Sequence, residues 1–157
     1  MDVRVGQGFD VHPWSDDAGR RLVLGGIVID GERGLAGHSD ADVVAHAVAD
    51  ALLGAAGLGD IGAHFPDTDP RWAGADSLAL LRHVVGLVNG EGWSIANVDT
   101  TVVLEAPRLA RHKSAMETAL AGALGAPVSV KAKRAEGLGA LGRGEGIACL
   151  AVALLGR

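Results

Sequence analysis

Cysteine is nearly absent from the sequence, and so are long apolar runs and any excess of positive charge. Cys149 is the only cysteine among 157 residues, so no disulfide can form within the chain, which suits a reducing cytoplasm. The apolar stretches are interrupted, for example at Asp50 and Asp60, before they reach the length that spans a bilayer. Residues 1–5 lack the charged-then-apolar layout of a signal peptide. We expect a cytoplasmic protein without membrane contact.

The charge balance limits the possible partners. The net charge is −5 at pH 7 and the sequence pI is about 5.6, which argues against a surface that binds nucleic acid. A single phosphate site stays possible because it needs only local positive charge. With 48% apolar and 21% charged residues, and no repeat or linker, the chain is expected to form one catalytic domain over residues 1–157.

A polar cluster opens a predicted helix near Asp40. Ser39 or Asp40 can act as the N-cap, and apolar residues then recur with the helical period. Asp42, His46 and Asp50 are spaced by four residues and therefore share one edge of this helix. His46 could bind a metal through one ring nitrogen while an acid one turn away accepts the other N–H. The alternative is a solvated polar face without chemistry.

Asp10 and His12 favour the metal interpretation. Residues 3–12 alternate as in a strand, in which side chains two residues apart point the same way. Gly6 and Gly8 indicate a bulge or a close backbone approach. With His46 the set becomes one oxygen and two nitrogen ligands, which is typical of catalytic zinc sites, although other divalent metals also accept these ligands.

The remaining pattern predicts an α/β sandwich: a mixed sheet with three helices on one face, plus a small hairpin. The hairpin is expected at 22–24 and 27–29 around Gly25-Gly26. The later elements are a helix from Asp76 or Ser77 to Asn89, a strand at 95–104, a helix with Pro107 in its first turn and Gly125 at its end, and strands at 128–133 and 147–155.

Two loops remain open to interpretation. Residues 65–69 contain two acids and an aromatic, and form either an ordinary turn or an active-site loop. Gly137, Gly139 and Gly142 match the spacing of a dinucleotide motif, but a strand rather than a helix follows them. We therefore predict a flexible glycine loop that carries Arg143 and Glu145.

The ordered motifs resemble the 2-C-methyl-D-erythritol 2,4-cyclodiphosphate synthase family almost end to end. They are Gly8-Phe9-Asp10-Val11-His12, His38-Ser39-Asp40-Ala41-Asp42 with His46, Asp50-Ala51-Leu52-Leu53-Gly54, Gly59-Asp60-Ile61-Gly62, Phe65-Pro66-Asp67-Thr68-Asp69, Gly74-Ala75-Asp76-Ser77, Asn97-Val98-Asp99 and Gly142-Arg143-Gly144-Glu145-Gly146-Ile147-Ala148.

This resemblance implies a homotrimer with active sites between subunits. Its implied substrate is 4-diphosphocytidyl-2-C-methyl-D-erythritol 2-phosphate, which cyclises with release of CMP. Asp10, His12 and His46 would hold one Zn²⁺ per subunit, with Asp42 and Asp50 as candidate outer partners. Glu136 would hold a second ion, Mg²⁺ or Mn²⁺, at the diphosphate.

The resemblance also implies two groups of ligand-binding residues. The substrate group is His38, Ser39, Asp60, Ile61, Gly62, Phe65, Pro66, Asp67, Thr68 and Asp69. The cytidine-binding group, expected in a neighbouring subunit, is Leu104, Glu105, Ala106, Pro107, Arg108, Leu109, Ala110, Ala132, Lys133, Arg134 and Ala135.

Two departures from the family pattern qualify the expectation. The family usually has a hydroxyl-rich run before Glu136, whereas this chain has Lys133-Arg134-Ala135. Either a cation of this run replaces the missing phosphate contact, or Lys133 and Arg134 are a solvated basic pair. Ala140 stands where the family commonly has a phenylalanine in a cavity on the trimer axis, near Arg143.

A metal-binding trimer without turnover and a metal phosphohydrolase are the alternative functions.

Overall fold

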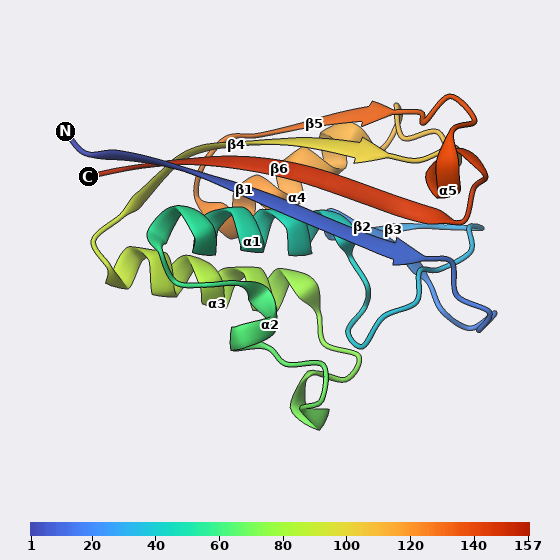
Figure 1. Cartoon of the computed structure of the whole chain (residues 1–157), viewed down its shortest axis with the longest axis horizontal. Coiled ribbons are helices and arrows are strands. Elements are labelled where there is room, and N and C mark those ends of the chain that lie inside the picture. Colours follow the sequence, from blue (N-terminus) through green and yellow to red (C-terminus); the bar gives the residue numbers. More distant parts are fainter.

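The computed structural model describes residues 1–157 as a mixed sheet covered on one face by helices, as predicted (Figure 1). The strands are β1 (Val3–Pro13), β4 (Ser94–Val103), β5 (Val128–Lys133) and β6 (Gly146–Gly156). Their order in the sheet is β1-β6-β4-β5, with β4 and β5 parallel and the other neighbours antiparallel. β2 (Leu22–Leu24) and β3 (Ile27–Ile29) form the predicted hairpin.

Three longer helices make the second layer. They are α1 (Val43–Ala56), α3 (Ser77–Gly90) and α4 (Lys113–Leu124). α1 lies against β1 and β6, α3 packs on α1, and α4 packs on β5. Short helical turns occur at α2 (Ile61–His64), η1 (Pro70–Trp72) and α5 (Gly139–Gly142). No helix combines the length and the apolarity needed to cross a membrane.

Two predicted element boundaries are wrong. α4 begins at Lys113, so Pro107 lies in the loop before the helix rather than in its first turn. Hydrogen bonds within turns pair backbone groups of that loop; for example, His112 N–H donates to the Leu109 carbonyl. The glycine-rich segment before β6 is not wholly loop, since it contains α5.

The start of α1 also differs from the prediction of Ser39 or Asp40 as N-cap. Asp42 is the cap: its Oδ1 accepts from the N–H groups of Val44 at 3.1 Å and Ala45 at 3.0 Å. Its carboxylate also accepts from Gly25 and Gly26 of the hairpin, at 2.8 and 2.7 Å. Ala41 has a φ of 58°, a left-handed conformation that excludes the preceding residues from the helix. Asp42 therefore joins the hairpin to α1.

Glycines allow α1 to touch the sheet backbone. A Cβ at Gly8 would lie 1.8 Å from the Ala47 carbonyl oxygen, and one at Gly6 would lie 1.9 Å from that of Ala51. The pairing of β1 with β6 runs without a shift from Val3 to Pro13. Of the two predicted reasons for these glycines, the close approach is confirmed and the bulge is wrong.

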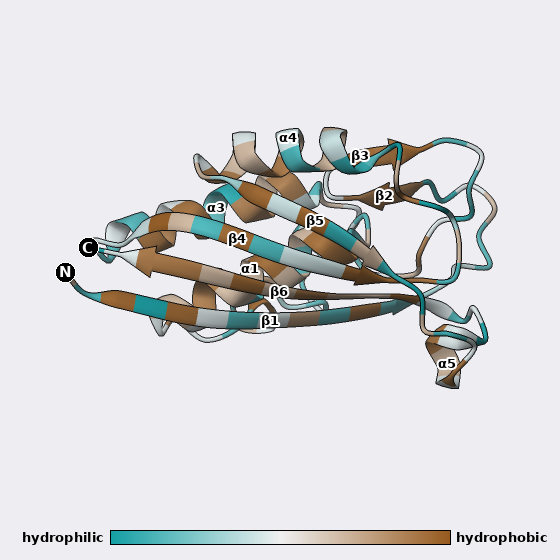
Figure 2. Ribbon diagram, turned by 90° about the horizontal axis from the view of Figure 1, so that it is seen from above, coloured by the Kyte–Doolittle hydropathy of each residue, from teal (hydrophilic) through white to brown (hydrophobic).

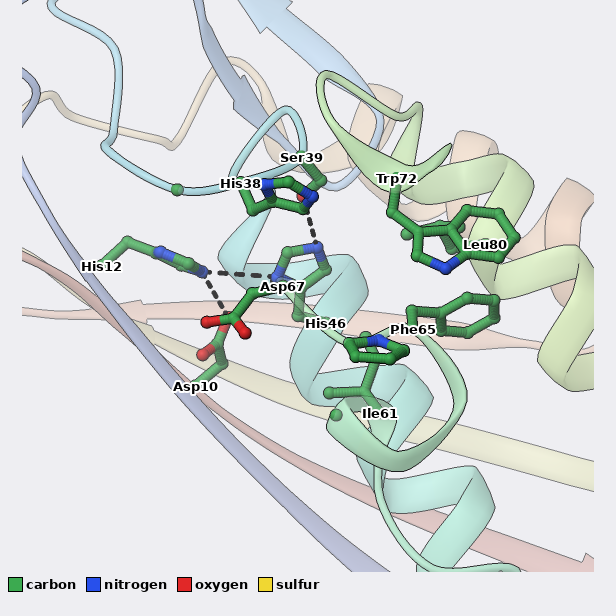
Figure 3. Close-up of a pocket in the computed structure, with 13 residues that line it drawn as sticks. Asp10, His12, His38, Ser39, His46, Ile61, Phe65, Asp67, Trp72 and Leu80 are labelled. Carbon is green, nitrogen blue, oxygen red and sulfur yellow. Dashed lines mark hydrogen bonds and ion pairs between the residues drawn. The ribbon is translucent and has the colours of Figure 1, made fainter. Parts of the chain in front are cut away.

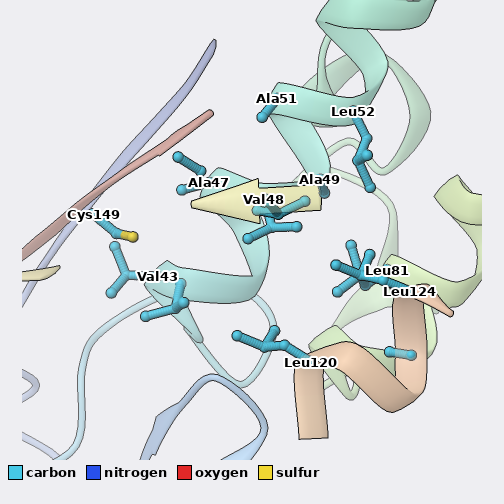
Figure 4. Packing of buried hydrophobic residues seen from close by; sticks show 14 of the residues in the cluster. Val43, Ala47, Val48, Ala49, Ala51, Leu52, Leu81, Leu120, Leu124 and Cys149 are labelled. Atoms are coloured by element: carbon cyan, nitrogen blue, oxygen red, sulfur yellow. The ribbon is translucent and has the colours of Figure 1, made fainter. Parts of the chain in front are cut away.

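The core fills the space between the sheet and the helices. Figure 4 shows Val48 and Leu52 of α1 near Leu81 of α3 and Leu120 of α4, all fully buried. Cys149 of β6 is buried on the same side, and burial raises the pKa of its thiol. A buried thiol that resists ionisation is unreactive, in line with the predicted core role.

The opposite face of the sheet has no helical cover. Figure 2 shows this face, with the sheet in front of the helices. Its exposed apolar residues belong to β1 and β6, and we call them the open sheet face: Val3, Val5, Phe9, Val11, Leu150 and Val152. Phe9 is 55% and Val5 68% exposed. An apolar strip of this kind on a folded chain is typical of an interaction surface.

Candidate metal centre and adjoining clefts

Asp10, His12 and His46 converge at one point between β1 and α1 (Figure 3). Asp10 Oδ2 lies 2.8 Å from His12 Nε2 and 3.1 Å from His46 Nδ1, and the two ring nitrogens are 3.3 Å apart. All three donor atoms lie within 4.8 Å of one another. The two-residue spacing on β1 and the position of His46 one turn into α1 produce this cluster.

The donor set fits a divalent cation. The Nδ1 of His12 lies 2.8 Å from the Ala36 carbonyl oxygen, which can only accept, so this nitrogen carries the proton. The Nε2 of His12 is then free to bind an ion beside the Asp10 carboxylate. One carboxylate oxygen and two imidazole nitrogens suit zinc and several other divalent metals.

The pKa shifts of Asp10 and His12 indicate that the cluster stabilises positive charge beside the Asp10 carboxylate. Burial would raise the pKa of Asp10, but hydrogen bonds from His12 and His46 outweigh it and lower this pKa to about 2. Burial would lower the pKa of His12, but its contact with Asp10 outweighs this and raises the pKa. A protonated imidazole attracts the carboxylate as a bound cation would.

The cluster opens into a cleft of about 500 Å³, which we call the metal cleft. Seven of the ten residues predicted to bind substrate line it: His38, Ser39, Ile61, Gly62, Phe65, Pro66 and Asp67. Gly37, Trp72 and Leu80 also line it and were not predicted. Trp72 packs edge-on against Phe65 with ring centroids 5.0 Å apart. The sequence carried no signal for Trp72 and Leu80, because apolar residues of this kind are typical of a core.

Three predicted substrate residues do not line the metal cleft. Asp60 caps α2 by accepting from Ala63 N–H at 2.9 Å. Asp69 caps η1, and its side chain pairs with Arg71 at 2.6 Å. Thr68 lies exposed between them. Asp60 and Asp69 thus shape the loop around the cleft, and the Asp69 carbonyl accepts from His38 Nε2 at 2.9 Å.

The predicted outer partners of His46 have other roles. Asp42 is occupied as the cap of α1, and Asp50 Oδ1 accepts from Ile61 N–H at 2.7 Å. Neither carboxylate is hydrogen-bonded to the ring. The Nε2 of His46 instead lies 2.8 Å from Ser77 Oγ and 3.1 Å from Ser39 Oγ. Ser77 belongs to α3, so helical spacing within α1 could not reveal it.

A second cleft, of about 460 Å³, lies at the ends of β4 and β5, and we call it the strand-end cleft. All nine of its lining residues belong to the predicted cytidine-binding group; Ala106 and Ala135 are the two members that do not line it. The two clefts share no residue.

Glu105 binds two residues of the run Lys133-Arg134-Ala135 at this cleft. Arg134 donates to Glu105 Oε2 from Nε at 3.1 Å and from a terminal nitrogen at 2.8 Å, while Ala135 N–H donates to Oε1 at 2.8 Å. These bonds, led by the one with Arg134, lower the pKa of Glu105. Lys133 forms no ion pair in the chain.

The other predicted site residues lie outside both clefts. Glu136 follows β5 in a left-handed conformation with φ of 54°, and its side chain is exposed. Ala140 belongs to α5, and Arg143 pairs with Glu145 at 2.6 Å. The single chain does not bring Glu136 to the metal centre, and its role as a ligand of a second ion stays a prediction.

Comparison with known proteins decides the family. The YgbB family model matches residues 3–156. The chain belongs to the YgbB family. A Burkholderia thailandensis protein named 2-C-methyl-D-erythritol 2,4-cyclodiphosphate synthase is 58% identical over 160 residues, covering 100% of this YgbB-family chain and 98% of the relative.

Solved structures of relatives share the YgbB fold of this chain. The bifunctional IspDF from Campylobacter jejuni superposes with a TM-score of 0.93 at 41% identity, covering 98% of this chain and 42% of that one. A Plasmodium falciparum IspF complex with CDP superposes with a TM-score of 0.84 at 32% identity, covering 98% of this chain and 95% of that one.

Proposed function

We propose that this protein is a 2-C-methyl-D-erythritol 2,4-cyclodiphosphate synthase, a phosphorus–oxygen lyase of the non-mevalonate isoprenoid pathway. An oxygen of the substrate's 2-phosphate attacks the β-phosphorus of 4-diphosphocytidyl-2-C-methyl-D-erythritol 2-phosphate. The bond from that phosphorus to the oxygen bridging to the α-phosphate breaks, so CMP leaves and the cyclic diphosphate closes. The convergence of Asp10, His12 and His46 on the metal cleft carries this proposal, and the named relatives support it.

The residues around the metal cleft suit an intramolecular reaction. Aligning two groups of one molecule can contribute roughly 7–11 kcal/mol toward the barrier, so the walls need mainly to fold the substrate. Asp10, His12 and His46 would hold zinc, which when bound supplies Lewis-acid polarisation of the β-phosphate. His38 and Ser39, which line the cleft, would face the methylerythritol phosphate, and Ile61, Gly62 and Phe65 would enclose the sugar portion. Asp60 and Asp69 support this enclosing loop, and Thr68 lies exposed on it.

The strand-end cleft is proposed to bind the cytidine and its phosphates. Since Glu105 holds Arg134, Lys133 is the cation of the run Lys133-Arg134-Ala135 that is free to contact a phosphate, and Arg108 of the same cleft also has no ion pair. Glu136, exposed at the adjoining turn, is proposed to hold Mg²⁺ or Mn²⁺ between the α- and β-phosphates.

A homotrimer would unite the two clefts. They share no lining residue in the single chain, and the open sheet face provides an apolar surface for packing three copies around an axis. We propose that the metal cleft of one subunit adjoins the strand-end cleft of the next, that each chain contributes one catalytic domain, and that the trimer works in the cytoplasm.

Purified protein incubated with the substrate tests the function. We expect release of CMP with cyclic product, and we expect His46→Ala to lose both bound zinc and activity while keeping the circular dichroism spectrum of the fold. Substrate binding without CMP release would identify a binding module, and an uncyclised bisphosphate would identify a phosphohydrolase. Either of these outcomes, or full activity of His46→Ala without metal, contradicts the proposal.

A further inference from the structure

We propose that Ser77 and Asp40 form a hydrogen-bonded relay that fixes the ring of His46, so that its Nδ1 lone pair points at the cation. The relay runs from α1 through the start of α3 to the loop before α1. It rests on the proposed metal centre and assigns positioning roles to two residues that touch neither the ion nor the substrate.

Three contacts define the relay. His46 Nε2 lies 2.8 Å from Ser77 Oγ. The Ser77 hydroxyl donates to Asp40 Oδ1, and the Ser77 backbone N–H donates to Asp40 Oδ2 at 3.0 Å. Ser77 is 1% exposed, so water does not compete for these bonds.

The direction of each bond follows from the available protons. An ionised carboxylate only accepts, so the single hydroxyl proton of Ser77 is committed to Asp40. The oxygen of Ser77 therefore presents a lone pair to His46, and a second lone pair at 2.8 Å would repel it. Nε2 must carry a proton and donate it, so when a cation is bound the unprotonated nitrogen is Nδ1, which lies 3.1 Å from Asp10 Oδ2 and 3.3 Å from His12 Nε2.

Ser39 does not offer a competing arrangement. Its Oγ lies farther from His46 Nε2, at 3.1 Å, and already accepts from Ala41 N–H at 3.3 Å. Ser39 Oγ acts as a second acceptor for the same ring proton. The hydroxyl proton of Ser39 is then free to point toward the metal cleft, which this residue lines.

Backbone bonds hold the relay in register. Asp40 N–H donates to the Ala75 carbonyl at 3.0 Å, and Gly74 N–H donates to the His38 carbonyl at 2.8 Å. Asp40 Oδ1 also accepts from Asp42 N–H at 3.1 Å, which connects the carboxylate to the cap of α1. The loops before α1 and α3 thus form one unit that positions Ser77 against His46.

Zinc affinity tests the relay separately from turnover. Loss of such outer partners typically weakens metal binding about 10–100-fold. We expect this loss in Ser77→Ala, measured by competition with a chromophoric chelator, and affinity near that of the wild type in Ser77→Thr, which keeps the hydroxyl. Ser129→Ala is the matched control, because Ser129 makes the same kind of bond to Asp99 at 2.6 Å, on the exposed sheet.

The tautomer can be read without any substitution. In zinc-loaded protein labelled with ¹⁵N, two-bond NMR correlations should show the His46 proton on Nε2. A proton on Nδ1, or unchanged zinc affinity in folded Ser77→Ala, would overturn the relay alone. Failure of the wild-type protein to bind zinc would overturn the metal centre and the relay with it.

Discussion

Among single residues, the pairing of Asp10 with His12 links metal binding to pH. A metal needs the unprotonated Nε2 of His12, and protons compete for the same atom. Although burial alone would lower the pKa of His12, its bond to Asp10 raises this pKa, so the competition extends to higher pH. The stability of the metal-free protein depends on pH in the opposite direction to metal affinity. The ion pair between protonated His12 and Asp10 stabilises the fold at low pH, and this contribution is lost as pH rises through the raised pKa of His12.

We therefore predict that zinc affinity falls as pH drops through the pKa of His12, by about tenfold per unit below it, since one proton is displaced from this ring. Chelator competition between about pH 5.5 and 8 measures the slope. Asp10→Asn is expected to bind zinc weakly, and to shift the midpoint of the His12 ring NMR titration in metal-free protein to lower pH. An affinity independent of pH across this range would contradict the proposed ligand role of His12.

At the scale of elements, the contact of α1 with β1 depends on residues that lack a side chain. Gly8 brings the strand against the Ala47 carbonyl, and a methyl group there would overlap the helix backbone. Gly8→Ala should destabilise the fold by about 1–3 kcal/mol, the usual cost of overpacking, and should also weaken zinc binding because the two elements carry the ligands. Urea unfolding and chelator competition measure the two effects.

Gly86 provides the control for this substitution. It lies exposed inside α3, and a methyl group added there would meet no atom within 4 Å, so Gly86→Ala should stabilise the protein by roughly 0.5–1 kcal/mol. Equal stability of Gly8→Ala and the wild type would show that α1 can retreat from the sheet without cost.

The sequence predicted elements better than the contacts between them. The residue periodicity correctly predicted β1, α1, α3 and β6 as strands and helices. The positions of Asp10, His12 and His46 in these elements also predicted their convergence. The cap of α1 could not be predicted, because it depends on the left-handed Ala41 and on hairpin amides distant in sequence. The serine beside His46 was missed for the same reason, since it comes from another helix.

On the scale of the whole molecule, the apolar side of β1 faces away from the helices, contrary to the usual expectation. The alternation of Val3, Val5, Phe9 and Val11 would normally place these residues against the helices. In the structure they form part of the open sheet face, and Gly6, Gly8, Asp10 and His12 face α1 instead. A single sequence does not reveal that the sheet has a second apolar surface.

We predict that Phe9→Lys converts the proposed trimer to monomers, because packing the open sheet face would bury an unpaired charge. Light scattering on the purified protein measures the mass, and Ala115→Lys on the exposed side of α4 is the control, expected to remain trimeric. A monomeric wild-type protein, or a trimeric Phe9→Lys variant, would contradict the proposed assembly.

The origin of the proposed ion ligands in β1 and α1 has a consequence for how this protein can vary. These two elements touch backbone to backbone, whereas much of the surrounding wall comes from residues 61–72, a connection between α1 and α3. Insertions or replacements in that connection can reshape what enters the cavity without displacing the coordinating atoms. We therefore expect substrate preference and metal retention to be largely independent traits, open to separate change by selection or by design.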